Sequence, residues 1–538
     1  MKLESIQVPV GNRVLADYWS PNAAIHTFFE YEYSDEAFRK RAAYLEKQAK
    51  DQTEIASIIR QFMEPLGISD KINEHLKQLE QGALVVVGGQ QAGVLTGPLY
   101  SVNKAISVVA LAKEQSVKLQ RPVVPVFWIA GEDHDLEEIN HTYTMSGADV
   151  KKRAYGERSK RKTMASKTVL NKEAMTQFID TVVKDFGETA YTERLRKHLR
   201  DALAESDTFT DFFARLMNQL FKEEGLLMID AADTKFRQYE SQNFTHIIRN
   251  NVEIAHAVTA QEQAFDRAGY GTPIFSTSEA ANLFYVKDDE RHLLEYRHDQ
   301  FVNLAANIKL SREELLAIAE SHPEQLSNNV VTRPLMQEMT LPVLAFVGGP
   351  GELAYWATLK DAFSVLGLQM PIFAPRLHIT LITRQVEQLL KEYDLTVEDV
   401  WNGKAMQLKE QFIASVQDEE AKHQIWEIQQ QLNEKFAELE SHLEAGQISL
   451  NKVIMKNKET HLKQFNYLQQ KIEQTILAKN EVTIRKFMKL QNELYPNDGF
   501  QERSYNPYQY INEYGPSLID EMLKKSYEVG NRHYLLYL

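Results

Sequence analysis

Apolar positions recur in two different rhythms over the first three quarters of this chain, and each rhythm predicts one kind of element. Segments with an apolar residue every three or four positions predict helices. Between them, short unbroken apolar runs predict buried strands, at residues 83–87, 123–130, 226–230, 343–347 and 372–374. A strand, a helix and a second strand in that order form a right-handed βαβ unit. The pattern therefore predicts an α/β fold around a parallel sheet.

Two segments interrupt this alternation and are expected to be insertions into the sheet domain, residues 1–384. Residues 142–224 combine a basic, turn-prone stretch with amphipathic helices. The second insertion is expected at about 271–310, where residues 283–308 alternate polar and apolar positions as antiparallel strands do.

Residues 385–493 are nearly free of glycine and rich in Gln, Glu, Lys and Leu. Apolar residues spaced by three or four form one seam before Gly446 and a second seam after it. This predicts two long helices folded back as an antiparallel coiled-coil hairpin, each on the order of 55–60 Å long. Residues 494–538 regain Pro, Gly and Tyr, so we expect them to dock back on the core.

Composition narrows the classes of function. The chain has 538 residues, 61 basic against 75 acidic ones, a net charge of −14 and no cysteine. Such an acidic protein is a poor binder of nucleic acid, so no nucleic-acid partner is expected. Without cysteine there is no disulfide, thiolate metal site or catalytic thiol. Neither a signal peptide nor an apolar run of about 20 residues is present, so a cytoplasmic protein without a membrane partner is expected.

The strand expected at 83–87 runs into a glycine-rich turn, Gly88-Gly89-Gln90-Gln91-Ala92-Gly93, with Gly97 further on and a helix behind it. Backbone N–H groups and a helix N-terminus in this order form a cradle for a phosphate or carboxylate. The residues expected to bind a nucleotide or acid there are Gly89, Gln90, Gln91, Gly93, Thr96 and Gly97. Neither a Walker loop nor the dinucleotide pattern G-x-G-x-x-G is present. A tight turn without a ligand is the alternative.

The second strand ends in the cluster Glu132-Asp133-His134-Asp135. Strands of a parallel sheet bring their carboxyl ends to one edge, so this cluster is expected beside the glycine turn. His134 could act as an acid or base, and the carboxylates could hold Mg²⁺ or an amine. Capping of the next helix is the alternative. The spacing of His134, Glu138 and His141 also fits a metal on one helical face.

A second glycine turn, Gly349-Pro350-Gly351-Glu352, follows the strand at 343–347. It is expected to face the first turn, with Glu352 holding a substrate amine; a surface glutamate is the alternative. With Ala354 the turn also satisfies G-x-G-x-x-A, but the next strand ends in Pro375-Arg376, where an NAD site would want an acid.

Three further groups of residues are candidates. Arg333 and Arg376 flank strand ends and could clamp a carboxylate, or could be solvated or ion-paired. Ser504, Tyr505, Asn506 and Tyr510 could form a second nucleotide pocket. The alternative for the tyrosines is packing against the hairpin.

Three motifs in order, GGQQAGVLTGPLY, FWIAGEDHDLEEINH and FVGGPGELAYW, followed by a coiled coil, resemble the family of bacillithiol biosynthesis cysteine-adding enzymes over essentially the whole chain. The resemblance implies a Rossmann-type core with two connecting-peptide insertions and a coiled-coil hairpin that forms a homodimer. It also implies a ligase that joins L-cysteine to glucosaminyl-malate by an amide bond, in the last step of bacillithiol synthesis.

The family is also similar, more distantly, to class I aminoacyl-tRNA synthetases and the mycothiol cysteine ligase. This implies activation of the cysteine carboxylate by ATP with Mg²⁺, and Thr96, Asp133 and His134 as catalytic candidates, with Asp135 beside them. Leu95-Thr96-Gly97-Pro98 stands in the place of the HIGH motif without either histidine, and no KMSK motif follows the last strand. A zinc site is not expected, since there is no cysteine ligand. The alternatives are a nucleotide-sensing coiled-coil scaffold and an NAD-dependent oxidoreductase.

Overall fold

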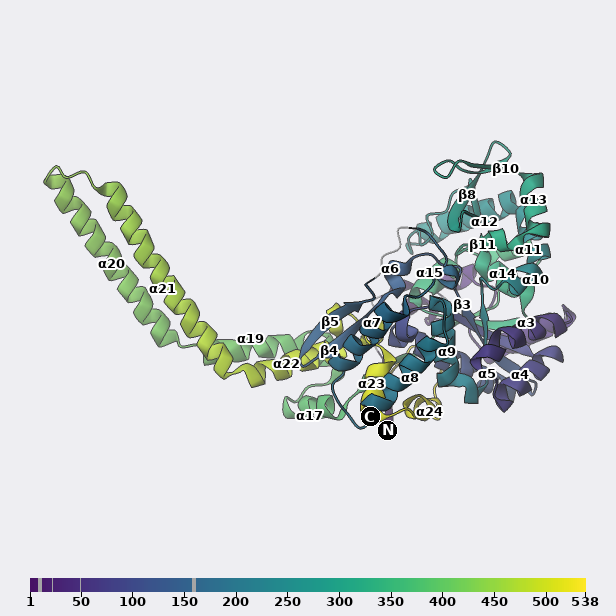
Figure 1. The fold of residues 1–538 in the computed structure, drawn as a ribbon, viewed down its shortest axis with the longest axis horizontal. Helices are drawn as coiled ribbons and strands as arrows, with labels where there is room; N and C mark the ends of the chain where they lie inside the picture. The colour runs from purple at the N-terminus through teal and green to yellow at the C-terminus, as the bar shows by residue number, and fades with distance from the viewer. Residues whose placement is uncertain (8–11, 22, 49, 157–160) are drawn as a thin grey trace. The chain divides into compact units, whose positions relative to one another are not determined.

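A computed structural model describes residues 1–7, 12–21, 23–48, 50–156 and 161–538 (Figure 1). The chain divides into two compact units. The core unit comprises residues 1–146, 150–382 and 499–538, and the helical unit comprises residues 147–149 and 383–498.

The core unit contains a five-stranded parallel sheet with the strand order β6-β3-β2-β12-β13. Its strands are β2 (Leu84–Gln90), β3 (Val123–Ile129), β6 (Leu227–Asp230), β12 (Val343–Gly348) and β13 (Ile372–Pro375). Nearly every side chain in them is buried, as expected for unbroken apolar runs. The predicted parallel sheet is therefore confirmed.

The strand order places a topological switch point between β2 and β12. The chain passes from β2 through β3 to β6 on one side, and then returns to add β12 and β13 on the other side of β2. Connections leave β2 and β12 in opposite directions, which opens a crevice at the carboxyl ends of these two strands. In open α/β sheets ligands bind in such a crevice.

Gly88 and Gly89 lie inside β2 and do not form the expected turn. A Cβ atom on Gly88 would lie 2.5 Å from Cγ2 of Val108, and one on Gly89 would lie 2.5 Å from the carbonyl oxygen of Trp128. These glycines therefore allow β2 to pack closely against its neighbours. The following helix, α5 (Leu99–Leu119), begins only at Leu99. The glycine-rich loop that leads from β2 to α5 therefore spans residues 91–98, and Gly88 and Gly89 belong to the strand instead.

The helices that lie before and between the strands of this sheet are mostly amphipathic. They are α1 (Arg13–Tyr18), α2 (Asp35–Lys47), α3 (Thr53–Met63), α4 (Asp70–Glu80), α6 (Leu136–Ile139), α7 (Lys172–Asp185), α8 (Thr192–Ala204), α9 (Phe209–Phe221), α10 (Thr234–Tyr239), α11 (Ser241–Arg249) and α12 (Asn251–Arg267). Side chains of Ser34, Ser69 and Thr208 cap α2, α4 and α9. β4 (His141–Ser146) and β5 (Asp149–Ala154) form a separate two-stranded sheet.

A second, antiparallel sheet has the order β10-β9-β8-β7-β11. Its strands are β7 (Ala280–Lys287), β8 (Glu290–Arg297), β9 (Gln300–Asn303), β10 (Ile308–Ser311) and β11 (Leu326–Asn328). Asp288 and Asp289 both have positive φ and make the tight turn between β7 and β8. Two helices follow, α13 (Arg312–Ser321) and α14 (Thr332–Thr340). The antiparallel strands predicted at 283–308 are present, and β11 joins them from outside that segment.

A third sheet ties the end of the chain to the core unit. β15 (His533–Tyr537) lies between β1 (Lys2–Ile6), with which it is antiparallel, and β14 (His378–Ile382), with which it is parallel. The short helices of this region are α15 (Pro350–Trp356), α16 (Lys360–Val365), α23 (Pro507–Tyr514) and α24 (Leu518–Leu523). The sequence pattern did not predict β1, β14 or β15.

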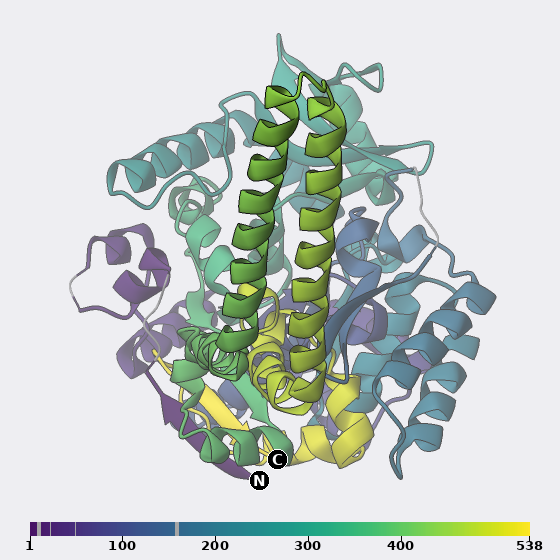
Figure 2. The ribbon, with the colours of Figure 1, turned by 90° about the vertical axis from the view of Figure 1, so that its left-hand side faces the viewer.

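The helical unit contains the coiled coil, in which α20 (Glu419–Ala445) and α21 (Asn451–Lys479) lie side by side and antiparallel (Figures 1 and 2). The other helices are α17 (Arg384–Glu392), α18 (Val397–Trp401), α19 (Lys404–Val416) and α22 (Glu481–Leu494). Gly446 ends α20, as predicted. Among the residues that the structure describes, no helix is long and apolar enough to cross a membrane.

Candidate functional site

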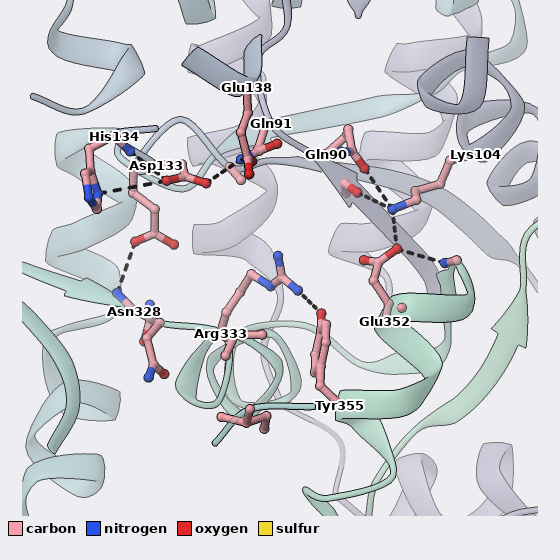
Figure 3. Close-up of a pocket in the computed structure, with 18 of the residues that line it drawn as sticks. Gln90, Gln91, Lys104, Asp133, His134, Glu138, Asn328, Arg333, Glu352 and Tyr355 are labelled. Carbon is pink, nitrogen blue, oxygen red and sulfur yellow. Dashed lines mark hydrogen bonds and ion pairs between the residues drawn. The ribbon is translucent and has the colours of Figure 1, made fainter. Parts of the chain in front are cut away.

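A cavity of about 930 Å³ opens at the switch point, at the carboxyl ends of β2 and β12 (Figure 3). The sequence-predicted residues that line it are Gly89, Gln90, Gln91, Asp133, His134, Arg333, Gly349, Gly351, Glu352 and Arg376. The two glycine-containing segments and the acid–histidine cluster thus meet at one place, as their positions at strand ends predict. All of these residues belong to the core unit.

Lys104, which lines the cavity, joins the end of β2 to the first turn of α15, the helix that follows β12. Its Nζ donates to the carbonyl oxygen of Gly89 at 2.7 Å, to Oε1 of Gln90 at 3.0 Å and to Oε2 of Glu352 at 2.6 Å. Glu352 also accepts from the backbone N–H of Gly349 at 2.8 Å, which caps α15. Burial opposes ionisation of Glu352, but the charge of Lys104 holds the pKa of Glu352 below its usual range. Lys104 therefore neutralises the carboxylate that was expected to hold a substrate amine.

One wall of the cavity is acidic. The side-chain amide of Gln91 donates to Oδ2 of Asp133 at 2.7 Å and to Oε2 of Glu138 at 2.8 Å (Figure 3). Burial opposes ionisation of Asp133, but Gln91 and Arg291 hold its pKa below the usual range. Glu138 makes no ion pair with any described residue. Gln91 thus holds two carboxylates together, and together they carry more negative charge than their neighbours neutralise.

Arg291, from β8, sets the chemical state of His134. Its Nη1 donates to Nδ1 of His134 at 3.1 Å, while its Nε donates to Oγ of Ser327 at 3.0 Å and its Nη2 to the carbonyl oxygen of Asn328 at 2.9 Å. A guanidinium can only donate, so Nδ1 must accept and the hydrogen lies on Nε2. Burial and the charge of Arg291 both lower the pKa of His134. His134 is therefore a neutral imidazole that offers an Nε2–H donor.

Glu132 has a structural role that supports this arrangement. It is buried, pairs with Arg237, and accepts from Oγ of Ser327 at 2.9 Å and from the backbone N–H of Asn328 at 3.1 Å. Ser327 and Asn328 in turn accept from Arg291. Glu132 thereby fixes β11 against the end of β3 and helps to place the guanidinium beside His134.

The basic residues differ in how far their charge is already neutralised. Arg376 makes a bidentate ion pair with Glu502 at 2.8 and 2.7 Å. Of the two roles considered for Arg376, the ion pair is therefore the one observed, and its guanidinium is not free to bind the carboxylate of a ligand. Arg333 donates to the hydroxyl of Tyr355. Within the described part of the chain, neither Arg333 nor Arg503, which also lines the cavity, pairs with a carboxylate. These two cations remain available to an anionic ligand.

Thr96, Gly93 and Gly97 do not line the cavity; they belong to a buried loop. Thr96 is fully buried with φ of +67°, and a Cβ atom on Gly93 would lie 2.8 Å from Cα of Gly97. The side-chain amide of Asn506 donates to the carbonyl oxygens of Leu95 and Gly97 at 2.6 and 2.9 Å. Close backbone packing in this loop thus accounts for the presence of Gly93, Thr96 and Gly97, which were expected to contact a ligand.

The remaining predicted residues also lie outside the lining of this cavity. Asp135 is exposed. Tyr505, Asn506 and Tyr510 are completely or almost completely buried, and Ser504 is 6% exposed. Both tyrosines belong to the hydrophobic core of the core unit, so the expected second nucleotide pocket is replaced by core packing. That packing is within the core unit.

The metal alternative does not fit the geometry. α6 spans only Leu136–Ile139, and His141 begins β4, so His134, Glu138 and His141 do not share one helix. In the described ranges, no group of three His, Cys, Asp or Glu side chains is placed to hold a metal ion.

Sequence reasoning missed Lys104, Arg291 and Arg503. Lys104 carried a usable signal, because it is the single charged residue in the apolar helical segment 99–112. A charge at such a position is rarely buried without a partner. Arg291 lies in the polar segment DDERHLLEYR, where nothing distinguishes it from a solvated residue.

Comparison with known proteins gives one consistent family. A family model described as "Bacillithiol biosynthesis BshC, N-terminal Rossmann-like domain" matches residues 1–377, and one described as "Bacillithiol biosynthesis BshC, C-terminal coiled-coil domain" matches residues 379–538. Proteins named "Putative cysteine ligase BshC" are similar over 100% of both chains. They are 72% identical in Lysinibacillus sphaericus, 38% in Geobacillus kaustophilus and 35% in Bacillus licheniformis. The chain belongs to the bacillithiol biosynthesis BshC family.

Proposed function

We propose that this protein is a ligase that joins the carboxyl group of L-cysteine to the amine of glucosaminyl-malate, the last step of bacillithiol synthesis, with ATP as the activating nucleotide. Family membership and the names of the relatives support the reaction class. The observation that carries the proposal is the cavity at the switch point. Incompletely neutralised carboxylates line it together with guanidinium groups that pair with no carboxylate among the described residues. A zwitterionic amino acid and an anionic cosubstrate both require such a division of charge.

The side chains of the cavity take complementary parts in this reaction. Asp133 and Glu138 bind the ammonium group of cysteine, since carboxylates are its natural acceptors. Arg333 and Arg503 bind anionic groups, the cysteine carboxylate or the phosphates of ATP. His134 donates from Nε2 to an oxygen of the bound substrates. Mg²⁺ would arrive with the nucleotide, because it is usually held by substrate phosphates and one or two carboxylates.

The proposed chemistry has two steps. A carboxylate oxygen of cysteine attacks the α-phosphorus of ATP, a new P–O bond forms and pyrophosphate leaves. The amine of glucosaminyl-malate then attacks the acyl carbon, the amide bond forms, AMP leaves and the nitrogen loses a proton. Negative charge develops on the phosphoryl oxygens in the first step, and guanidinium groups already oriented toward that charge stabilise it.

The test is to incubate the purified protein with cysteine, glucosaminyl-malate and Mg-ATP, and to measure the thiol product and each nucleotide product. Bacillithiol with equimolar AMP and pyrophosphate is expected. Formation of ADP and phosphate would show that the intermediate is an acyl phosphate and not an adenylate. Absence of bacillithiol would overturn the proposed function. Asp133→Asn should raise the KM for cysteine about 10- to 100-fold, the value of one charge-assisted hydrogen bond. Asp135→Asn, outside the cavity, is the matched control.

We also propose that two copies of the chain associate through the coiled coil. Several large apolar side chains of α20 and α21 remain exposed, among them Trp426, Ile428, Leu439, Val453, Met455, Tyr467 and Leu468. Exposed apolar patches of this kind support an interface with another surface. The hairpin thus leaves large apolar side chains exposed, and a second copy of the chain would cover them.

A further inference from the structure

One wall of the cavity is apolar although its other walls are charged. Phe284 of β7 and Leu293 of β8 are directly opposed in the antiparallel ladder. Ile274, from the loop before β7, and Val330, from the loop after β11, also line the cavity. Leu293 is 46% exposed and Val330 is 36% exposed. We call Ile274, Phe284, Leu293 and Val330 the apolar wall; a ligand that covered it would remove apolar surface from water.

The apolar wall borders the residues proposed to bind the cysteine ammonium group. The guanidinium of Arg291 lies 3.9 Å from the ring centroid of Phe284 and 3.7 Å from Oδ1 of Asp133. The rings of His134 and Phe284 are 5.8 Å apart between centroids. Arg291 therefore separates the carboxylate from the aromatic ring by the width of one side chain. A small amino acid bound to Asp133 through its ammonium group has its side chain within reach of this wall.

The wall is held in place before any ligand binds. The carboxylate of Glu262 accepts from the backbone N–H groups of Ile274 at 2.6 Å, Phe275 at 2.9 Å and Ser276 at 2.6 Å. Three successive N–H groups on one carboxylate fix the loop that carries Ile274. Because the loop is already ordered, little conformational entropy is lost when a ligand contacts the wall.

We propose that the apolar wall is the subsite for the side chain of cysteine and makes the ligase prefer a thiol to a hydroxyl group. This inference rests on the proposed function. A thiol is a weak hydrogen-bond donor and acceptor and behaves as a small apolar group. A hydroxyl group on the same surface loses its hydrogen bonds to water and receives none from the four side chains of the wall. The wall thus selects cysteine over serine.

The sharpest test changes polarity without changing shape. Threonine and valine are nearly isosteric, so Val330→Thr replaces one methyl group of the wall by a hydroxyl group, and Leu293→Thr is compared with Leu293→Val in the same way. kcat/KM is measured for cysteine, for L-2-aminobutyrate, which has a methyl in place of the thiol, and for serine. The wild type should prefer cysteine over serine about 100-fold and should use aminobutyrate better than serine.

A hydroxyl on the wall should lower the cysteine-to-serine ratio of kcat/KM about 3- to 10-fold, the value of one neutral hydrogen bond. Leu304→Thr, at an exposed turn outside the cavity, should leave the ratio unchanged. Unchanged ratios in Val330→Thr and Leu293→Thr, or better use of serine than of aminobutyrate by the wild type, would overturn the inference. So would a change confined to the KM for ATP, which would assign the wall to the nucleotide. If the wild type makes no product from cysteine, the proposed function itself fails.

Discussion

Nη1 of Arg291 lies 3.1 Å from Nδ1 of His134, and this contact couples the inserted antiparallel sheet to the acid–histidine cluster of the parallel sheet. The two residues are 157 positions apart in the chain. Because a guanidinium only donates, the contact is compatible with a neutral imidazole alone. Protonation of His134 would place two donors against each other and displace Arg291.

The first prediction concerns the pH dependence that follows from this contact. Burial and Arg291 both lower the pKa of His134, so the neutral form persists to a lower pH than for a solvated histidine. Activity should fall as the pH drops through that lowered pKa. In Arg291→Met the pKa rises, and the acidic limb of the kcat/KM profile should move to higher pH while activity at pH 8 is largely retained. In His134→Gln the limb should disappear. A limb that stays in place in Arg291→Met would contradict the assignment.

The second prediction concerns the ion pair between Lys104 and Glu352. Lys104 is almost completely buried, so Glu352→Gln leaves a buried ammonium without its carboxylate, and Lys104→Met leaves the carboxylate without its ammonium. Each single variant should lower the free energy of unfolding by about 3 kcal/mol. The double variant should lose less than the sum, as expected for partners in direct contact. Urea denaturation measures all three; strictly additive losses would show that the pair is not coupled. Lys40→Met, at an exposed pair, should change little.

The third prediction concerns the loop that contains Thr96. Asn506→Asp keeps the shape of the side chain but removes the two N–H donors that satisfy the carbonyl oxygens of Leu95 and Gly97. Two buried carbonyl groups then lose their partner, and the free energy of unfolding should fall by about 2–4 kcal/mol. Since these residues do not line the cavity, the KM for cysteine should change far less than in Asp133→Asn. Asn307→Asp, in an exposed turn, is the control. A stability equal to that of the wild type would show that Asn506 does not hold the loop.

The fourth prediction concerns association through α20 and α21. Ile428→Glu combined with Leu439→Glu places charges on exposed apolar positions of α20, where they should prevent a second copy from packing. Sedimentation velocity should show a dimer for the wild type and a monomer for the double variant, with unchanged helicity by circular dichroism. Gln430→Glu adds one charge at an exposed polar position and should remain dimeric. A monomeric wild type would remove the basis for this interface.

The elements of the fold could largely be predicted from the sequence, whereas the pairing of side chains in the site could not. Unbroken apolar runs predict strands that are buried on both faces, and apolar residues spaced by three or four predict helices, because burial of each element imposes its pattern on the sequence. β1, β14 and β15 were not predicted because they mix polar with apolar residues and pair segments that lie far apart in the chain. Gly88 and Gly89 were misread since a glycine needed for close packing and a glycine needed for a ligand look identical in a sequence.

The sequence by itself determined the parallel sheet, the coiled-coil hairpin and the position of Asp133 and His134 at a strand end, because these depend on local periodicity and on the rule that parallel strands end at one edge. Only the tertiary structure decided which charges are free. Lys104 neutralises Glu352 and Glu502 neutralises Arg376, while Arg333 pairs with no carboxylate among the described residues. The charge that a residue offers to a ligand depends on neighbours 126 to 248 positions away, and that proximity exists only in the folded chain.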